Sequence, residues 1–237
     1  MPSARQNMDA DVHGTAARLA RRLKAGGHTI TLAESCTGGL LASTLTDIAG
    51  SSEWFNQSWI TYANAAKMRE LGVQEITLAK HGAVSAHVAI EMAKGALERA
   101  HADYAISITG IAGPTADLTS KQVGSVYVGI ASHSWTNAEH TQIGGTRSEN
   151  KEGFVYFALL KAIEHFDQAM ENAKKAKEAA VMKEEELRQK AIKFEQERAA
   201  REKAARESAP WQDEAWSASS KKEADIASEI TWQDSEE

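Results

Sequence analysis

The chain has 237 residues, with 27 Lys and Arg against 33 Asp and Glu, and its net charge of −6 argues against a general nucleic-acid binder, which needs a basic face. Its single cysteine, Cys36, excludes an internal disulfide framework. No apolar run approaches the length of a membrane span, and the N-terminus lacks the apolar core of a signal peptide. We therefore expect a protein of the reducing cytoplasm, with neither nucleic-acid nor membrane partners.

Charge is distributed unevenly along the chain. Residues 1–170 hold 14 Lys and Arg and 16 Asp and Glu, a net charge of −2, whereas residues 171–237 hold 13 and 17, a net charge of −4 in less than half the length. The second part has few bulky apolar residues, so it cannot bury a core of its own. The predicted organisation is a flexible N-terminus over 1–10, one domain over 11–168, a charged helix over 169–206 and a disordered acidic tail over 207–237.

The first part of the domain begins with apolar side chains near helical spacing, and Gly26-Gly27 end that helix. A short apolar run then indicates a buried strand. Trp54-Phe55 either begin a short helical segment or cover an edge of the core. In chain order we expect a helix over 12–25, a strand over 29–33, a helix over 40–45, a strand over 58–62, and helices over 63–71 and 75–80.

The second part of the domain continues the alternation of helices and strands. Ser85 is placed to cap a helix that runs through Leu97. Strands are expected over 103–109, 123–131 and, at an edge of the sheet, 139–143, followed by a last helix over 147–168. This order predicts an α/β fold, a three-layer sandwich with helices on both faces of a mixed sheet.

The stretch after the first strand has the composition of a functional turn. Glu34-Ser35-Cys36-Thr37 is polar, and Gly38-Gly39 open the next helix. Such a turn places backbone N–H groups and the positive end of a helix dipole beside polar side chains, where an anion or an oxyanion is stabilised. Ser, Thr and Gly are also ordinary helix caps, so this stretch alone leaves a structural role open.

Ser35 needs a base, because a serine is a poor nucleophile until its proton is removed. Lys67, on the first turns of the helix 63–71, is the candidate base if burial holds it neutral. Tyr62, at the end of the preceding strand, is a candidate proton relay. Backbone N–H groups near Thr37 to Gly39 are the candidate oxyanion hole.

Two further glycine-rich turns supply candidate binding residues. The loop that follows the strand 103–109 contains Gly110 and Gly113, which permit positive φ and close backbone approach to a ligand. Arg147 follows a third such turn, and its guanidinium is suited to bind a phosphate through two parallel hydrogen bonds. Ligand sites of open α/β folds collect just beyond strand ends. The predicted substrate-binding residues are Thr37, Gly38, Gly39, Thr109, Gly110, Gly113 and Arg147.

Other interpretations of these residues stay open. Lys67 and Arg147 would otherwise be surface charges, and Tyr62 a strand-end aromatic. Cys36 is a competing nucleophile beside Ser35, and Ser35 is preferred only because no histidine is obviously placed to activate the thiol. Neither a local serine-hydrolase signature nor a P-loop is present.

The eight histidines show no paired spacing of metal ligands. His81 is interpreted as a loop residue and His87 as a residue on a helix surface. No metal and no cofactor are predicted.

The charged segment 169–206 is rich in Ala, Glu, Lys and Arg, which favour helix. It lacks a sustained heptad seam, so a solvated single helix is expected rather than a coiled coil. Beyond it, the tripeptide Trp-Gln-Asp begins at Trp211 and again at Trp232, with Trp216 between them. Tryptophans among acidic residues are a candidate linear motif for a protein partner, and a low-complexity tail is the alternative.

Five motifs in register carry a resemblance to a known family. They are A-E-S-C-T-G-G-L at 33–40, Y-x-N-x-x-K at 62–67, L-G-V at 71–73, H-G-A-V-S at 81–85 and T-G-I-A-G-P at 109–114. Together they resemble the CinA C-terminal domain family over residues 10–167, in the same order.

The resemblance implies an α/β fold and, in active members, metal-free hydrolysis of the carboxamide of nicotinamide mononucleotide to nicotinic acid mononucleotide and ammonia, in pyridine nucleotide salvage. It matches the family's serine nucleophile, lysine, assisting tyrosine, loop threonine and arginine to Ser35, Lys67, Tyr62, Thr109 and Arg147. The implied mechanism is attack by Ser35 after Lys67 takes its proton, with an acyl-enzyme that water resolves. A small-molecule nucleotide is the expected ligand, and a homodimer the expected assembly.

The chain departs from the family pattern after Pro114. Thr115 to Gly124 replace a glycine-rich stretch followed by Lys-Pro-Val-Gly, which puts the substrate preference in question. Two rival hypotheses follow: a catalytically silent member that binds a nucleotide or a protein and acts through its tryptophan-containing tail, and an amidase for another small amide.

Overall fold

The computed structural model describes residues 4–115 and 121–208, with the backbone alone over 4–10. The elements in chain order are α1 (Ala4–Gly26), β1 (Ile30–Glu34), α2 (Leu40–Thr46), the 3₁₀ turn η1 (Ser51–Glu53), β2 (Phe55–Ile60), α3 (Asn64–Leu71), α4 (Glu75–His81), α5 (Ala86–Ala100), β3 (Tyr104–Gly110), β4 (Ser125–Ser132), β5 (Thr136–Gln142) and α6 (Arg147–Ser208). The chain divides into two compact units at Glu171 and Asn172.

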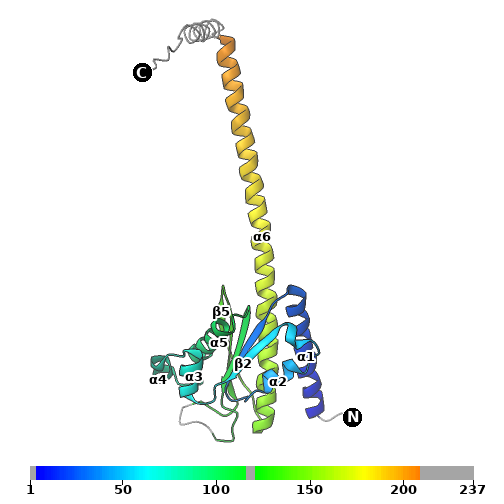
Figure 1. Ribbon diagram of the computed structural model, residues 1–237, viewed down its shortest axis with the longest axis vertical. Coiled ribbons are helices and arrows are strands. Elements are labelled where there is room, and N and C mark those ends of the chain that lie inside the picture. The colour runs from blue at the N-terminus through cyan, green and yellow to red at the C-terminus, as the bar shows by residue number, and fades with distance from the viewer. Residues whose placement is uncertain (1–3, 116–120, 209–237) are drawn as a thin grey trace, which may run out of the picture. The chain divides into compact units, whose positions relative to one another are not determined.

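The five strands form one mixed sheet in the order β2-β1-β3-β4-β5 (Figure 1). β2, β1 and β3 are parallel, whereas β4 runs antiparallel to β3, and β5 antiparallel to β4. Helices α1, α2 and α6 lie on one side of the sheet and α3, α4 and α5 on the other (Figure 1). The predicted α/β fold with a mixed sheet covered by helices is confirmed.

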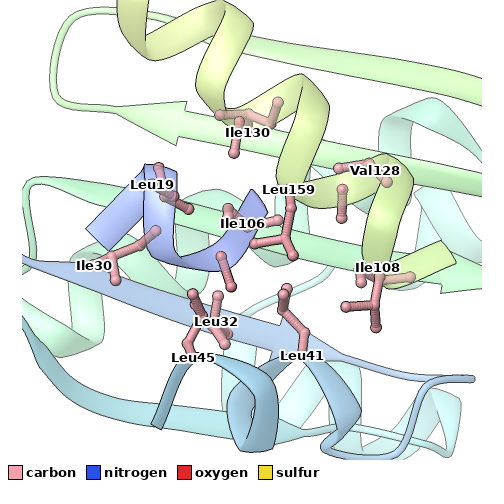
Figure 2. Close-up of a cluster of buried hydrophobic side chains, with 14 of the residues drawn as sticks. Leu19, Ile30, Leu32, Leu41, Leu45, Ile106, Ile108, Val128, Ile130 and Leu159 are labelled. Atoms are coloured by element: carbon pink, nitrogen blue, oxygen red, sulfur yellow. The ribbon is translucent and has the colours of Figure 1, made fainter. Parts of the chain in front are cut away.

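The larger core lies between the sheet and α1, α2 and α6. Alternate residues of the central strands point into it, as Figure 2 shows for Leu32 of β1 and Ile106 of β3. Leu41 and Leu45 of α2 close this core from another side, and none of these four side chains is more than 1% exposed. The period of two along each strand therefore divides the side chains between the two faces of the sheet.

The opposite face of the sheet carries small residues that let α5 approach closely. A Cβ added to Gly129 of β4 would fall 2.2 Å from the carbonyl oxygen of Ala89, so only glycine fits there. Ser107 of β3 donates a hydrogen bond of 2.6 Å from Oγ to the same oxygen. This close packing holds the N-terminal half of α5, and the loop before it, against the strands that build the site.

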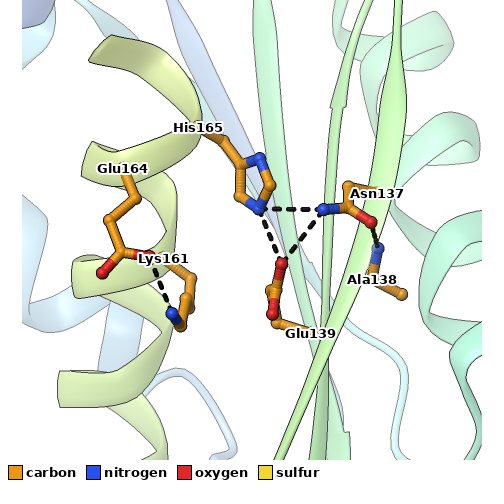
Figure 3. Close-up of polar contacts among 6 residues, drawn as sticks. All are labelled: Asn137, Ala138, Glu139, Lys161, Glu164 and His165. Carbon is orange, nitrogen blue, oxygen red and sulfur yellow. Dashed lines mark hydrogen bonds and ion pairs between the residues drawn. The ribbon is translucent and has the colours of Figure 1, made fainter. Parts of the chain in front are cut away.

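A turn of α6 around His165 is tied to the edge strand β5 by polar contacts (Figure 3). His165 Nε2 lies 2.9 Å from Glu139 Oε1, and Asn137 Nδ2 lies 3.0 Å from both atoms. On the other side of α6, Asp167 accepts hydrogen bonds of 2.6 and 2.8 Å from Arg22 of α1.

Several predicted bounds need correction. α1 begins at Ala4 rather than at residue 12, so residues 4–10, expected to be flexible, are helical. β2 occupies Phe55–Ile60 instead of 58–62, and Trp54 before it is 1% exposed. β2 pairs with β1 alone and is therefore an edge strand. Its residues are partly buried without a regular alternation, so the sequence pattern marks the bounds of the strand only weakly.

The last two predicted helices, 147–168 and 169–206, form one continuous helix over the described residues Arg147–Ser208. Every residue from 171 to 208 is exposed. Of the tail predicted as disordered, residues 209–237 lie outside the described residues, and with them Trp211, Trp216 and Trp232. None of the helices described combines the length and apolarity needed to cross a bilayer.

Candidate active site

The predicted functional turns meet at the carboxyl ends of the three parallel strands. β1 leads into Ser35, β2 leads through Thr61 and Tyr62 into α3, and β3 ends at Gly110. A cavity of about 310 Å³ opens there. Of the predicted site residues, its lining contains Ser35, Lys67, Tyr62, Thr109, Gly110, Gly113 and Arg147, but not Thr37, Gly38 or Gly39.

Ser35 and Lys67 form a buried pair at the base of this cavity. Lys67 is 1% exposed and Ser35 is 8% exposed. Nζ of Lys67 lies 3.0 Å from Oγ of Ser35, and it donates to the carbonyl oxygens of Thr61 at 2.9 Å and Tyr62 at 3.1 Å. α3 begins two residues after Tyr62, and its first turn carries Lys67 back beneath the end of β2.

Burial lowers the pKa of Lys67 to about 8, since a charged amine is poorly solvated in the interior. No carboxylate among the described residues pairs with Nζ, whose hydrogen-bond partners are one hydroxyl and two carbonyl oxygens. A neutral amine has two N–H bonds and one lone pair. Two donations to the carbonyls direct the lone pair toward Oγ of Ser35, which is the arrangement a general base requires.

The surroundings of Cys36 disfavour the thiolate form of its side chain. Its side chain is 5% exposed, and burial raises the pKa of its thiol to about 12, against the lowering effects of its backbone N–H and of Lys67. The thiolate, not the thiol, is nucleophilic. The physical argument therefore supports Ser35, although Cys36 also lines the cavity.

The N-terminus of α2 does not offer the anion site that the sequence predicted. Glu34 is 0% exposed, and its carboxylate accepts hydrogen bonds from the backbone N–H groups of Gly39 at 3.0 Å, Leu41 at 3.2 Å and Ala42 at 2.8 Å. This internal carboxylate occupies the positive end of the helix. The prediction of an anion bound there was wrong because the chain supplies its own.

The predicted oxyanion donors at the two glycines are also engaged. The N–H of Gly38 donates to the carbonyl of Ser35 at 3.1 Å, and that of Gly39 donates to Glu34. Gly38 and Gly39 have φ values of 64° and 94°, so they shape the turn that presents Ser35. Thr37 is buried, and its Oγ1 has no hydrogen-bond partner among the described residues.

Thr109 holds one wall of the cavity rather than projecting freely into it. Its Oγ1 donates a hydrogen bond of 2.7 Å to the carbonyl of Ala83. Ala83 and Val84, from the loop before α5, line the cavity together with Gly110 and Gly113 of the loop after β3. The hydroxyl therefore joins the two loops that face Ser35.

Arg147 and Tyr62 meet at the rim of the cavity. Arg147 donates from Nη2 to the hydroxyl of Tyr62 at 2.9 Å and from Nη1 to the carbonyl of Gly113 at 2.6 Å. The Tyr62 side chain is 59% exposed, so this hydroxyl contacts the guanidinium and solvent, while its backbone carbonyl reaches Lys67. The two contacts fix the guanidinium at the open end of the cavity.

Sequence reasoning missed some residues of the site. Asn64 lines the cavity, and its signal was available in the motif Y-x-N-x-x-K. The capping role of Glu34 was also missed, because Glu34 ends β1 and a whole turn separates it from the start of α2. Among residues 4–115 and 121–208, no group of three or more His, Cys, Asp or Glu side chains is arranged to hold a metal ion.

The chain is an α/β protein whose mixed sheet holds the Ser35–Lys67 pair at the carboxyl ends of its parallel strands. The model of the CinA C-terminal domain matches residues 12–166, and the chain belongs to that family. A solved structure described as the competence/damage inducible protein CihA from Agrobacterium tumefaciens is 38% identical, with a TM-score of 0.63 over 65% of this chain and 94% of that chain.

Curated relatives with amidohydrolase names are also similar. The nicotinamide-nucleotide amidohydrolase PncC of Escherichia coli K12 is 52% identical over 123 residues, which cover 52% of this chain and 74% of that protein. The protein of the same name from Enterobacter agglomerans is 44% identical over 156 residues, which cover 65% of this chain and 95% of its own length.

Proposed function

We propose that this chain is an amidohydrolase that converts nicotinamide mononucleotide to nicotinic acid mononucleotide and ammonia through a Ser35–Lys67 mechanism, in pyridine nucleotide salvage. The names of the relatives support the reaction and the substrate. The single observation that carries the mechanism is the buried contact of 3.0 Å between Nζ of Lys67 and Oγ of Ser35.

In the first half of the reaction, Lys67 takes the proton of Ser35 as Oγ forms a bond to the carboxamide carbon. The carbonyl π electrons move to oxygen and give a tetrahedral oxyanion. The C–N bond then breaks, and the nitrogen leaves as ammonia with a proton from Lys67, which returns to the neutral amine. The product of this half is an ester between Ser35 and the nicotinoyl group.

In the second half, Lys67 removes a proton from water, which attacks the ester carbon. The bond to Oγ breaks, and Oγ of Ser35 recovers its proton from Lys67. One water molecule is consumed and one carboxylic acid is released. Lys67 is the base in both halves, so its amine must return to the neutral state after each half. A pKa of about 8 leaves part of the amine neutral near neutral pH.

The oxyanion requires donors other than the two glycine amides, which are occupied. The N–H groups of Cys36 and Thr37 carry no backbone hydrogen bond among the described residues. The amide directly after a nucleophile is a common oxyanion donor, so we assign this part to Cys36, with Thr37 beside it.

The rim of the cavity is suited to the rest of the substrate. Arg147 presents a forked guanidinium at the open end of the cavity and is assigned to the ribose phosphate. Tyr62, held by Arg147, is assigned to assist proton transfer to the leaving nitrogen. A volume of about 310 Å³ lies at the lower end for pockets that bind small molecules, of about 300–1,000 Å³, and suits one mononucleotide.

The test is ammonia release from nicotinamide mononucleotide by the full chain, measured beside the Ser35→Ala variant. We expect wild-type protein to release ammonia from nicotinamide mononucleotide. The Ser35→Ala variant should lose this activity by about 10³-fold or more, while its circular dichroism spectrum stays that of the folded wild-type protein. Cys36→Ala is the matched control one residue away, and we expect it to remain active. Activity in Ser35→Ala combined with its loss in Cys36→Ala would show that the nucleophile is the thiol.

A panel of other small amides separates the substrate from the reaction type. Steady ammonia release from several amides, without preference for the nucleotide, would support a general amidase. No turnover by folded wild-type protein would support the binding hypothesis, which assigns a protein partner to the region of Trp211, Trp216 and Trp232. That partner and the homodimer remain predictions.

A further inference from the structure

Asn150, in the first turn of α6, is a buried polar side chain that the proposed reaction does not use. Every residue from 144 to 149 is exposed, whereas Asn150 is 0% exposed. The N-terminus of α6 has a cap of its own, because Thr146 donates from its backbone N–H and from Oγ1 to Glu149, at 2.7 Å in both cases. The amide of Asn150 is therefore free to serve another purpose than capping.

This amide joins two loops that are distant in the sequence. Its Nδ2 donates to the carbonyl oxygen of Ala112, in the loop after β3, at 3.0 Å, and to that of Gly145, in the turn before α6, at 3.1 Å. Ala112 lines the cavity. A side-chain amide nitrogen has two N–H donors, and these contacts use both. One side chain thus fixes the distance between a cavity loop and the turn that leads into Arg147.

The other end of the amide shows that Asn150 acts as a donor. Its Oδ1 is buried and has no hydrogen-bond partner among the described residues. An amide rotated by 180° would place this oxygen against two carbonyl oxygens, which is unfavourable. A buried acceptor without a partner costs free energy that an apolar side chain would not. The two donated hydrogen bonds are therefore the physical reason for an asparagine at this core position.

Arg147 uses the neighbouring carbonyl of the same loop. Asn150 holds the carbonyl oxygen of Ala112, and Arg147 donates from Nη1 to that of Gly113 at 2.6 Å. The backbone is permissive on both sides of this joint, because Gly113 and Gly145 have φ values of 91° and 138°. Arg147 itself is exposed. The buried amide therefore supplies a fixed point between two glycine segments that would otherwise move apart easily.

We propose that Asn150 is a positioning residue for Arg147. It holds the loop of Ala112 and Gly113 against the first turn of α6, and so keeps the guanidinium at the place on the rim where it meets the ligand. This inference rests on the proposed function, which gives Arg147 a contact with the nucleotide. Asn150 does not line the cavity, so it acts on the ligand only through Arg147. Its removal should weaken binding and leave the chemical step unchanged.

The experiment is a double-mutant cycle between Asn150 and Arg147, measured as the dissociation constant of nicotinamide mononucleotide. Calorimetry is carried out on the full chain carrying Ser35→Ala, which binds without turnover. Asn150→Leu keeps a similar volume and removes both donors, and we expect it to weaken binding by about 10-fold. When Arg147→Met is also present, Asn150→Leu should change the dissociation constant by less than about 2-fold, because the group that Asn150 positions is gone.

Ser148→Ala is the matched control, because Ser148 lies on the same turn, does not line the cavity and donates to Glu152 of its own helix at 3.2 Å. It should leave the dissociation constant unchanged. An equal loss of affinity from Asn150→Leu with and without Arg147 would mean that Asn150 supports the cavity by another route. That result, no loss in either background, or a failure of Ser35→Ala to bind the mononucleotide would each overturn the inference.

A second substitution covers the case in which Asn150→Leu does not fold. Asn150→Ala removes the same two donors without adding methyl groups, and it should show the same coupling to Arg147→Met. If circular dichroism shows that neither variant folds, Asn150 supports the domain as a whole and the inference fails. In active protein, Asn150→Leu should raise KM for the mononucleotide by about 10-fold at unchanged kcat. A fall in kcat at unchanged KM would instead place its effect on the Ser35–Lys67 pair.

The outcome of this experiment is separable from that of the proposed function. If wild-type protein releases ammonia from the mononucleotide and the cycle shows no coupling, the inference fails and the function stands. If wild-type protein releases no ammonia and yet the loss of affinity in Asn150→Leu depends on Arg147, the function fails and Asn150 remains the positioning residue of a binding site.

Discussion

The folded unit that ends at Glu171 and the remainder of α6, residues 172–208, use the same residue types in different ways. Lys67 in the first is 1% exposed and contacts carbonyl oxygens and a serine, whereas Lys190 in the second is exposed and pairs with Glu186 at 2.6 Å. Leu32 is 0% exposed, and Leu187 is 58% exposed. The comparison teaches that tertiary neighbours, more than residue type, decide the energetic and chemical role of a side chain.

Lys67→Met should produce the largest effect, because it removes the base. We expect turnover of nicotinamide mononucleotide to fall by about 10²–10⁴-fold at every pH, since titration cannot restore a missing base. In wild-type protein, kcat/KM should rise as the pH increases through the pKa of Lys67, about 8, as the neutral amine becomes populated. Rates measured from pH 6 to 9.5 test both statements, and a flat profile in wild-type protein would argue against Lys67 as the base.

The same variant tests whether Lys67 is costly to bury. Its pKa is about 8 in the folded protein, below the ordinary value of 10.5, so between these values the unfolded chain binds more protons and stability rises with pH. The raised pKa of Cys36, about 12 against 9.0, acts in the opposite sense above pH 9. We therefore expect wild-type protein to gain stability relative to Lys67→Met between pH 7 and 9 in urea titrations, and an identical change in both would contradict this.

The next prediction replaces one leucine by alanine in each of the two regions. Leu32→Ala removes a buried side chain of the larger core and should lower the free energy of unfolding by about 2–5 kcal/mol. Leu187→Ala removes an exposed side chain and should change it by less than about 0.5 kcal/mol. Denaturant unfolding followed by tryptophan fluorescence measures both. Comparable destabilisation by Leu187→Ala would show that this part of α6 is covered by a partner or a second copy.

The smallest expected effects compare two polar contacts. His165→Ala removes the contact to Glu139 of β5, which joins elements distant in sequence, and should cost about 1 kcal/mol. Lys190→Ala removes an exposed contact to Glu186 one helical turn away and should cost about 0.3–0.5 kcal/mol at most. The free energy of unfolding should also be measured at low and high salt. Salt screens exposed charges, so only the exposed Lys190–Glu186 pair should lose its whole contribution to stability at high salt.

Much of the fold could be predicted from the sequence, because the central strands are buried on both faces. The apolar runs of β1, β3 and β4 follow from that burial, and Ser85 is the expected cap, accepting a hydrogen bond from the N–H of Val88 at 3.3 Å. Edge elements were placed less well. The bounds of β2 and the start of α1 were missed because their one-sided or surface environment leaves a weaker pattern.

For the site, the sequence by itself determined the residue types and their order. The spacing of the motifs also showed that these residues follow strands. Only the tertiary structure decided what each group does. The Ser35–Lys67 contact, the depressed lysine pKa and the stacking of His81 on His87 join segments far apart in the chain.

The occupied N-terminus of α2 shows the same division most clearly. The sequence places Glu34 before Gly38 and Gly39 in one short turn, and both an empty anion site and an internally capped helix are compatible with that order. The direction of one side chain makes the difference, because Glu34 turns inward and satisfies three N–H groups. Local pattern determines which groups are available, and burial and distance, which depend on the whole fold, determine which of them remain free to react.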